Sequence, residues 1–237
     1  MPHDERPVPG VWREGRLELD CGGRRFVIRR EADLEALWDA MDQTAFGGDE
    51  RLPYWAELWP AGVFLAQWFA EDPARVAGLR CLDLGCGLGY TALAAAWLGG
   101  RVLGVDYEPE AVRHAVMNAR RNGLADRPLA FACMDWRRPG LAPGAFERIW
   151  GGDVVYERRF FEPLERLFAG ALAPGGLVWI AEPVRDVSRD VWADWAGRGW
   201  AVRRVDERMV PLGAQRPRVR LWELRRPDHG FGRVSGE

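Results

Sequence analysis

The segment "GGDVVY", residues 151–156, places a carboxylate and a phenol three residues apart, where an apolar run gives way to charge. The preceding "FERIW" is typical of a buried strand, so Asp153 and Tyr156 follow at its carboxyl end. A carboxylate can attract and orient a cation, and a tyrosine ring can offer the same cation its π-face. The spacing favours two side chains that face one site. A helix N-cap or a turn carboxylate for Asp153, and plain packing for Tyr156, are the alternatives.

A second group of candidates lies in "CLDLGCGLG", residues 81–89. Its alternate glycines permit a tight strand-to-helix turn and the close approach of a ligand to the backbone. A dinucleotide turn would require Gly-x-Gly-x-x-Gly, but the last position, counted from Gly85, is Tyr90. With Asp83 two residues ahead, Gly85, Gly87 and Gly89 instead suit a nucleoside that carries an amino acid. A structural glycine turn is the alternative.

Two later strand ends also carry acids. Asp106 in "VLGVDYEPE" can accept from both hydroxyls of a ribose, although an N-cap on the following helix is an alternative. In "CMDW", Asp135 can accept from an adenine amine while Trp136 or Cys133 flanks the ring, and plain packing is the alternative for Trp136. A glycine turn, a ribose acceptor and an adenine acceptor together meet the chemistry of S-adenosylmethionine (SAM).

The elements that must position these residues alternate between strands and helices. Helices are expected at 62–72, 90–99, 109–123, 158–172 and 188–199, and strands at 79–85, 101–106, 128–135, 146–156, 177–183, 200–210 and 216–226, with "APGG" (173–176) as a turn. This alternation predicts a doubly wound α/β fold, whose ligands bind outside the carboxyl ends of the strands. The last two strands have no helix between them and must pair antiparallel.

The chain divides into three parts by pattern. Residues 1–52 form an N-terminal extension, with a β-hairpin around Gly22-Gly23 and a helix over 31–41. Residues 53–226 form the α/β domain, and residues 227–237 a flexible tail. The extension could be a lid over the site or an open rim beside it.

The ordered set "CLDLGCGLG", Asp106 and "MDW" resembles the motifs of class I SAM-dependent methyltransferases over roughly residues 60–224. The resemblance implies a seven-stranded sheet of order 3-2-1-4-5-7-6 with an antiparallel last strand. "PYWAELWPAG" (53–62) and "GGDVVY" are also similar to the Asp-x-x-Tyr subgroup, which includes protein-lysine methyltransferases. It implies that Asp153 and Tyr156 face a substrate amine, that Trp59 borders the cofactor, and that Trp55 and Glu182 lie on the substrate side.

The function implied by the resemblance is N-methylation of protein lysines, with the β-subunit of electron-transfer flavoprotein as a plausible substrate. A small amine or heterocycle, such as nicotinamide, is the alternative substrate, and a SAM-binding scaffold without turnover is a third hypothesis. Nucleobase methylation is disfavoured, because the enzymes that perform it usually carry Asn/Asp-Pro-Pro-Tyr/Phe where this chain has Asp-Val-Val-Tyr.

The composition disfavours several classes of protein and several kinds of site. A net charge of −2 argues against a non-specific nucleic-acid binder. The four cysteines form no Cys-x-x-Cys pair, which disfavours a zinc site or a disulfide framework, and no His/Cys/Asp constellation predicts a metal. No signal peptide or membrane-length apolar run is present. We therefore expect a soluble cytoplasmic protein without membrane partners.

Overall fold

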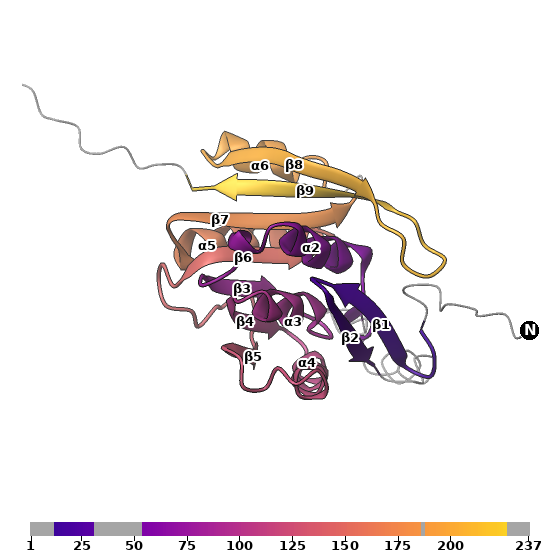
Figure 1. The fold of residues 1–237 in the computed structure, drawn as a ribbon. Helices are drawn as coiled ribbons and strands as arrows, with labels where there is room; N and C mark the ends of the chain where they lie inside the picture. Colours follow the sequence, from indigo (N-terminus) through magenta and orange to yellow (C-terminus); the bar gives the residue numbers. More distant parts are fainter. Residues whose placement is uncertain (1–11, 31–53, 186–187, 227–237) are drawn as a thin grey trace, which may run out of the picture.

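The seven-stranded sheet predicted from the sequence is present in the computed structural model (Figure 1). The model describes residues 12–30, 54–185 and 188–226. Its strand order is β5-β4-β3-β6-β7-β9-β8, in which β9 runs antiparallel to both neighbours and the other pairings are parallel. The strands are β3 Arg80–Leu84, β4 Arg101–Asp106, β5 Leu129–Cys133, β6 Phe146–Gly152, β7 Leu172–Pro183, β8 Ala201–Met209 and β9 Arg218–Arg225. The fold class is thus confirmed.

Helices cover both faces of this sheet. They are α2 Pro60–Glu71, α3 Tyr90–Trp97, α4 Pro109–Arg121, α5 Phe161–Ala171 and α6 Val191–Gly197, with short 3-10 turns at Tyr54–Ala56, Pro73–Arg75 and Arg158–Phe160. One core joins α2, α3 and the N-terminal hairpin to the sheet, and a second core joins α5 and α6 to the other face. In Figure 1, α2 and α3 lie in front of the sheet and α5 and α6 behind it.

Most elements begin or end within a few residues of the predicted bounds, and two larger differences lie at the end of β6 and the start of β7. The strand expected to reach Tyr156 ends at Gly152, because Asp153 has a left-handed backbone with φ 61° and the chain folds back on itself. A Cβ at Gly151 would lie 2.6 Å from the nearest Val154 methyl carbon, which shows how tight this reversal is. The "APGG" segment is part of β7 instead of a separate turn, since the β6–β7 ladder starts at Phe146–Leu172.

The predicted hairpin is also confirmed, as β1 Arg16–Cys21 and β2 Arg24–Arg29. Two asparagines one turn apart, Asn118 in α4 and Asn122 at its C-cap, bind the free edge of β2. Asn122 accepts from Val27 N (2.9 Å) and donates to Val27 O (2.8 Å), and Asn118 does the same with Arg29 N (2.9 Å) and Arg29 O (3.0 Å). These side-chain amides replace a neighbouring strand, so the hairpin edge has no unpaired backbone groups at these positions. The expected helix at 31–41 lies outside the described residues.

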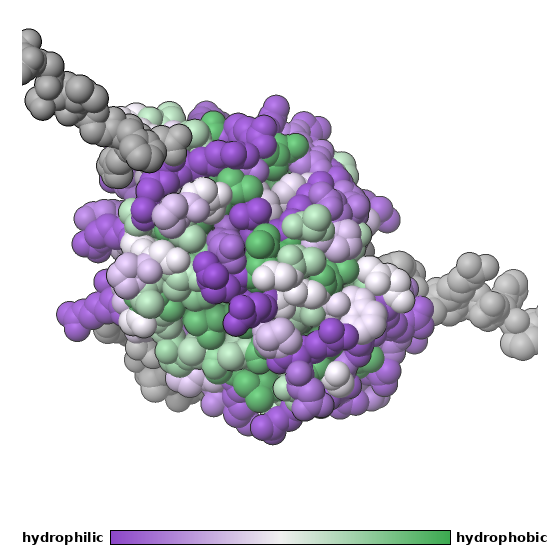
Figure 2. Space-filling model, turned by 60° about the vertical axis from the view of Figure 1, so that its left-hand side comes forward, coloured by the Kyte–Doolittle hydropathy of each residue, from purple (hydrophilic) through white to green (hydrophobic). Residues whose placement is uncertain are grey.

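The surface seen in Figure 2 is mixed in hydropathy. Figure 2 shows the side at the left of Figure 1, where hydrophilic and hydrophobic residues are interspersed. Within residues 12–30, 54–185 and 188–226, no helix is both long enough and apolar enough to span a bilayer.

Candidate functional site

A cavity opens at the carboxyl ends of β3, β4, β5 and β6, where the fold class predicts a ligand site. Its walls come from five segments: the approach to α2, the β3–α3 turn and the loops after β4, β5 and β6. The residues that line it are Tyr54, Trp55, Glu57, Leu58, Trp59, Gly62, Asp83, Gly85, Gly87, Thr91, Asp106, Tyr107, Glu108, Asp135, Trp136, Arg137, Gly152, Asp153, Val154, Tyr156, Arg159 and Phe160. Ten of the twelve residues predicted for the site are in this set, and Gly89 and Glu182 are not.

The glycine turn has two separate tasks. A Cβ at Gly85 would come 3.3 Å from the Trp136 ring, and one at Gly87 would come 3.3 Å from the Trp55 carbonyl oxygen, so both glycines keep this part of the cavity open. At Gly89 the backbone is left-handed, with φ 85°, and a Cβ would lie 2.9 Å from the Ala115 Cβ of α4. Gly89 therefore serves the close packing of α3 against α4, and the cofactor contact predicted for it stays a prediction.

Asp106 is held rigidly at the end of β4. Its Oδ2 accepts from Gly87 N (2.8 Å) and its Oδ1 from Glu108 N (3.0 Å), while Glu108 itself occupies the N-cap position of α4. Each oxygen keeps a second lone pair for a further donor. Burial raises the pKa of Asp106 to about 6, and the two backbone donors oppose this rise. At neutral pH the group is thus a fixed, charged acceptor of the kind that two neighbouring hydroxyls require.

Two buried polar atoms of the lining have no hydrogen-bond partner among the described residues: Asp83 Oδ2 and Trp136 Nε1. Burial raises the pKa of Asp83 well above its usual range, and the neighbouring Trp150 indole opposes this rise. Orphaned buried polar groups cost free energy, about 1–3 kcal/mol each. An acceptor and a donor left over in the wall of one cavity fit a ligand that carries both kinds of group, as an amino-acid-bearing nucleoside does.

Asp135 is tied to a neighbour on its own loop. Its Oδ1 accepts from the backbone N of Arg137 (2.9 Å), and Arg137 Nε lies 3.0 Å from both carboxylate oxygens. This guanidinium lowers the pKa of Asp135. Beside it, Trp136 packs edge-on against Phe160, with ring centroids 5.5 Å apart. Asp135 is therefore an anion at the cavity wall, and the adenine contact stays a prediction.

Asp153 is buried and already paired. Its side chain is 7% exposed, and its Oδ2 accepts from Arg185 Nη2 at 2.7 Å. Its backbone N donates to Ala181 O (2.7 Å), which ties the loop to the end of β7. Burial raises the pKa of Asp153 to about 6, Arg185 opposes this, and Glu182 adds to it. The N-cap alternative does not hold, because Glu157 and Phe160 cap the helices that follow.

Aromatic rings form the wall around Tyr156. Its ring meets Tyr54 and Phe160 edge-on at centroid distances of 5.9 and 5.7 Å. Burial raises the pKa of Tyr156 to about 12, so its hydroxyl stays protonated at neutral pH. Trp59 donates from Nε1 to the Tyr54 carbonyl (2.9 Å), and the Trp55 ring lies 5.3 Å from that of His114. Tyr156 thus lies among aromatic rings, as a site for a cationic group requires.

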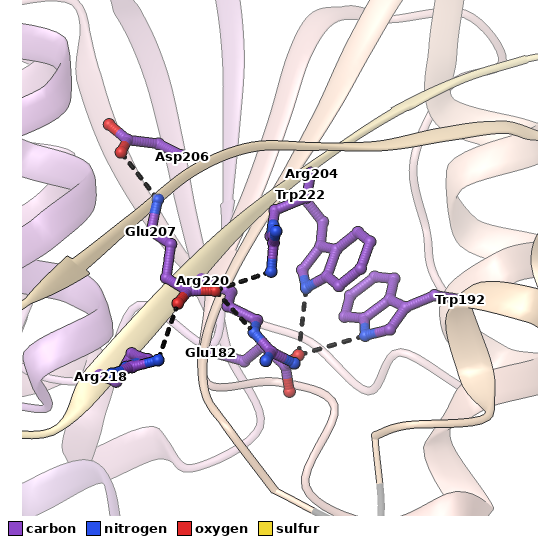
Figure 3. A network of polar contacts seen from close by, with 8 residues as sticks. All are labelled: Glu182, Trp192, Arg204, Asp206, Glu207, Arg218, Arg220 and Trp222. Atoms are coloured by element: carbon purple, nitrogen blue, oxygen red, sulfur yellow. Dashed lines mark hydrogen bonds and ion pairs between the residues drawn. The ribbon is translucent and has the colours of Figure 1, made fainter.

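Glu182 lies near the end of β7, behind the cavity wall. It is 2% exposed, and its Oε1 accepts from the indole nitrogens of Trp192 and Trp222, both at 3.1 Å (Figure 3). The structure therefore does not bring Glu182 to the substrate side, where the sequence placed it. It acts on the site only at a distance, through the pKa of Asp153.

Twelve lining residues were not predicted, among them Tyr54, Tyr107, Arg159 and Phe160. Each is one to four residues from a predicted site residue, so proximity in sequence was the available signal. Their contact with the cavity depends on loop conformations that periodicity does not encode.

Residues 81–176 match the family model described as a methyltransferase domain. The matched segment runs from β3 to the start of β7 and carries most of the cavity lining, so this part of the chain is similar to methyltransferase domains. Electron transfer flavoprotein beta subunit lysine methyltransferase of Danio rerio is 35% identical over 115 residues, which are 48% of this chain and 43% of that protein. Ribosomal protein L11 methyltransferase of Pseudomonas putida is 30% identical over 149 residues, covering 62% and 48%. The chain spans about half the length of these curated relatives.

Among solved structures, magnesium protoporphyrin IX methyltransferase from Synechocystis PCC 6803, with bound SAM, superposes with a TM-score of 0.55 at 17% identity. The superposition covers 81% of this chain and 96% of that one. The similarity supports the fold.

Proposed function

We propose that this chain is a SAM-dependent N-methyltransferase that acts on lysine side chains of a protein. The observation that carries the proposal is the cavity itself. The rigid carboxylate of Asp106 lines the part of the cavity that we assign to the cofactor. The buried carboxylate of Asp153, beside the Tyr156 ring, lines the part that we assign to the substrate.

The cofactor side fits SAM by its donor and acceptor groups. Asp106 would accept from the ribose hydroxyls, Gly85 and Gly87 would let the cofactor approach the backbone, and Asp83 would accept from its amino group. Trp59 and Trp136 would border it, and Asp135 would accept from its adenine. When bound, SAM supplies an electrophilic methyl group on a sulfonium.

On the substrate side, this chain's residues must hold an amine in line with that methyl group. Such positioning can supply about 7–11 kcal/mol of a barrier. Asp153, ionised above a pH of about 6, would attract the ammonium form of a lysine. The aromatic wall of Tyr156, Tyr54 and Phe160 would lower the cost of losing the proton to bulk water before methyl transfer, because desolvation disfavours a charged amine. The neutral amine would then be oriented by the Asp153 carboxylate.

A protein substrate is supported by the relatives, two groups of which carry names that specify protein methylation. The match to the electron transfer flavoprotein enzymes, with the Asp-x-x-Tyr motif at 153–156, makes the β-subunit of that flavoprotein our first candidate partner. A cytoplasmic setting belongs to the proposal, and the four free cysteines support a reducing compartment. The described hairpin residues contribute nothing to the cavity lining, which favours an open rim for that part of the extension.

Two matched variants separate cofactor binding from substrate handling. Asp106→Asn should weaken S-adenosylhomocysteine binding by at least about tenfold in calorimetry, because each hydrogen bond to a charged acceptor contributes about 1.5–3 kcal/mol. Asp153→Asn should bind S-adenosylhomocysteine as the parent does but lose methyl transfer. Normal binding by Asp106→Asn would contradict the ribose assignment, and full activity of Asp153→Asn would contradict the substrate assignment.

A further inference from the structure

The pairing register of β7, β9 and β8 aligns their residues in rows that run across the three strands, and alternate rows lie on the same face of the sheet. Val202, Leu224 and Val178 form one row, and Arg204, Trp222 and Ile180 the next. The third row is Glu207, Arg220 and Glu182, and the fourth is Met209 and Arg218. Val184 extends the fourth row, because its backbone N donates to Arg218 O (3.2 Å). Successive residues of a strand point to opposite faces, so these rows share a face.

Helix α6 covers only the first rows of this face. Trp192 of α6 stacks on Trp222 with ring centroids 4.5 Å apart. Beyond it, Met209 is 58% exposed and Val184 is 47% exposed, and both belong to the short set of large exposed hydrophobic residues in the described chain. The outer end of the face is therefore partly apolar and open to a partner.

The same end carries an excess of positive charge. One carboxylate, Glu207, is shared by Arg204 (2.8 Å), Arg220 (3.0 Å) and Arg218 (3.3 Å), as Figure 3 shows. Their side chains are 50%, 31% and 62% exposed. Three guanidinium groups on one carboxylate leave two positive charges unbalanced, in a chain whose formal net charge is −2.

The neighbouring acids cancel only part of this excess, since Glu182 lies beside Arg220 in its row. Asp206 and Glu71 share Arg208 on the opposite face, where Glu71 belongs to α2. Glu182 is buried beneath the face and accepts from two indoles. The exposed charge of the outer rows is therefore positive.

These rows are continuous with the substrate side of the cavity. Val184 follows the end of β7 and precedes Arg185, whose guanidinium pairs with the Asp153 carboxylate. A chain that presents an amine to Asp153 would thus run across Val184 and Arg218. We propose that Val184, Arg204, Met209, Arg218 and Arg220, which we call the basic rim, dock an acidic segment beside the methylated residue of the protein substrate. This inference rests on the proposed function and names the chemistry of its partner.

Fluorescence anisotropy tests the basic rim without any methyl transfer. The probe is a fluorescein-labelled peptide that alternates glutamate with glycine, and its control carries glutamine in place of glutamate. The glutamate peptide should bind more tightly by at least about fivefold, and added salt should weaken it, because exposed charge pairs are screened. The double variant Arg204→Gln/Arg218→Gln should lose this preference.

Arg113→Gln is the matched control, because Arg113 on α4 is 61% exposed and pairs with a single acid, Glu110. It should bind the glutamate peptide as the parent does, and unchanged S-adenosylhomocysteine affinity would show that the double variant is folded. Equal binding of both peptides, or an equal loss in Arg113→Gln, would overturn the inference. Neither result would affect the proposed function, which fails only if no protein lysine accepts the methyl group.

Discussion

The ion pair between Arg185 and Asp153 should set the pH below which kcat/KM falls, which is the acid limb of the pH–rate profile. With Arg185 in place, the pKa of Asp153 is about 6, so kcat/KM for an amine substrate should fall as the pH drops through about 6. Asp153 must be ionised to attract an ammonium group. Its protonation at lower pH therefore removes the attraction.

Arg185→Met removes the cation 2.7 Å from the carboxylate and leaves the burial that raises the pKa of Asp153. A nearby opposite charge shifts a carboxyl pKa by about 1–3 units. Because the Arg185 side chain is 35% exposed and therefore partly screened, we take a shift of about 1 pKa unit, which moves the midpoint of the acid limb from about pH 6 to about pH 7. At pH 6 the ionised fraction of Asp153 then falls from about a half to about a tenth, a loss of about fivefold in kcat/KM. At pH 8 the loss is only about a tenth.

The assay is transfer of labelled methyl from SAM to a saturable acceptor protein, measured as kcat/KM between pH 5.5 and 9. Arg185→Lys should keep the limb near the parent value, since it retains a cation. Arg166→Met, which removes an exposed partner of Glu162 on α5, should not move it. An acid limb that stays near pH 6 in Arg185→Met would refute the reasoning, and so would an equal loss at pH 6 and pH 8.

Two further predictions concern stability. Gly89→Ala should lower the free energy of unfolding by about 1–3 kcal/mol, because its Cβ would meet Ala115 at 2.9 Å on a left-handed backbone, while S-adenosylhomocysteine affinity of the folded protein stays unchanged. Asn122→Ala should cost about 2 kcal/mol, because it leaves the N and O of Val27 without their partners. Urea titration measures both, and a parent-like midpoint in either variant would contradict the corresponding packing or edge-pairing argument.

The parts of the fold with strong periodicity could be predicted from the sequence. Strand β4 has the predicted bounds, Arg101–Asp106, because an apolar run there ends in an acid and a helix with proline in its first turn follows. The end of β6 could not be predicted. Val154 and Val155 continue the apolar pattern, whereas the left-handed turn at Asp153 results from tertiary contacts with β7.

Site residues that depend on tertiary contacts were likewise not predictable from the sequence. Strand-end residues such as Asp106 and Asp153 could be predicted, since parallel strands bring their carboxyl ends together. The packing contact of Gly89 could not be predicted, because a sequence does not show which side of a turn meets a second helix. Arg185 was missed because its pairing with Asp153 joins the ends of two neighbouring strands, β6 and β7. Local spacing carries no signal for such a contact.

The central claim, transfer of a methyl group to a protein lysine, is tested most directly by the identity of the acceptor. Purified protein is incubated with methyl-labelled SAM and a lysate of the source cells, with the Asp153→Asn variant as the control. The protein fraction is then hydrolysed to amino acids. We expect label in a discrete protein band and in methylated lysine, and no such label with Asp153→Asn. Label confined to the small-molecule fraction, or carried by another amino acid, would contradict the claim.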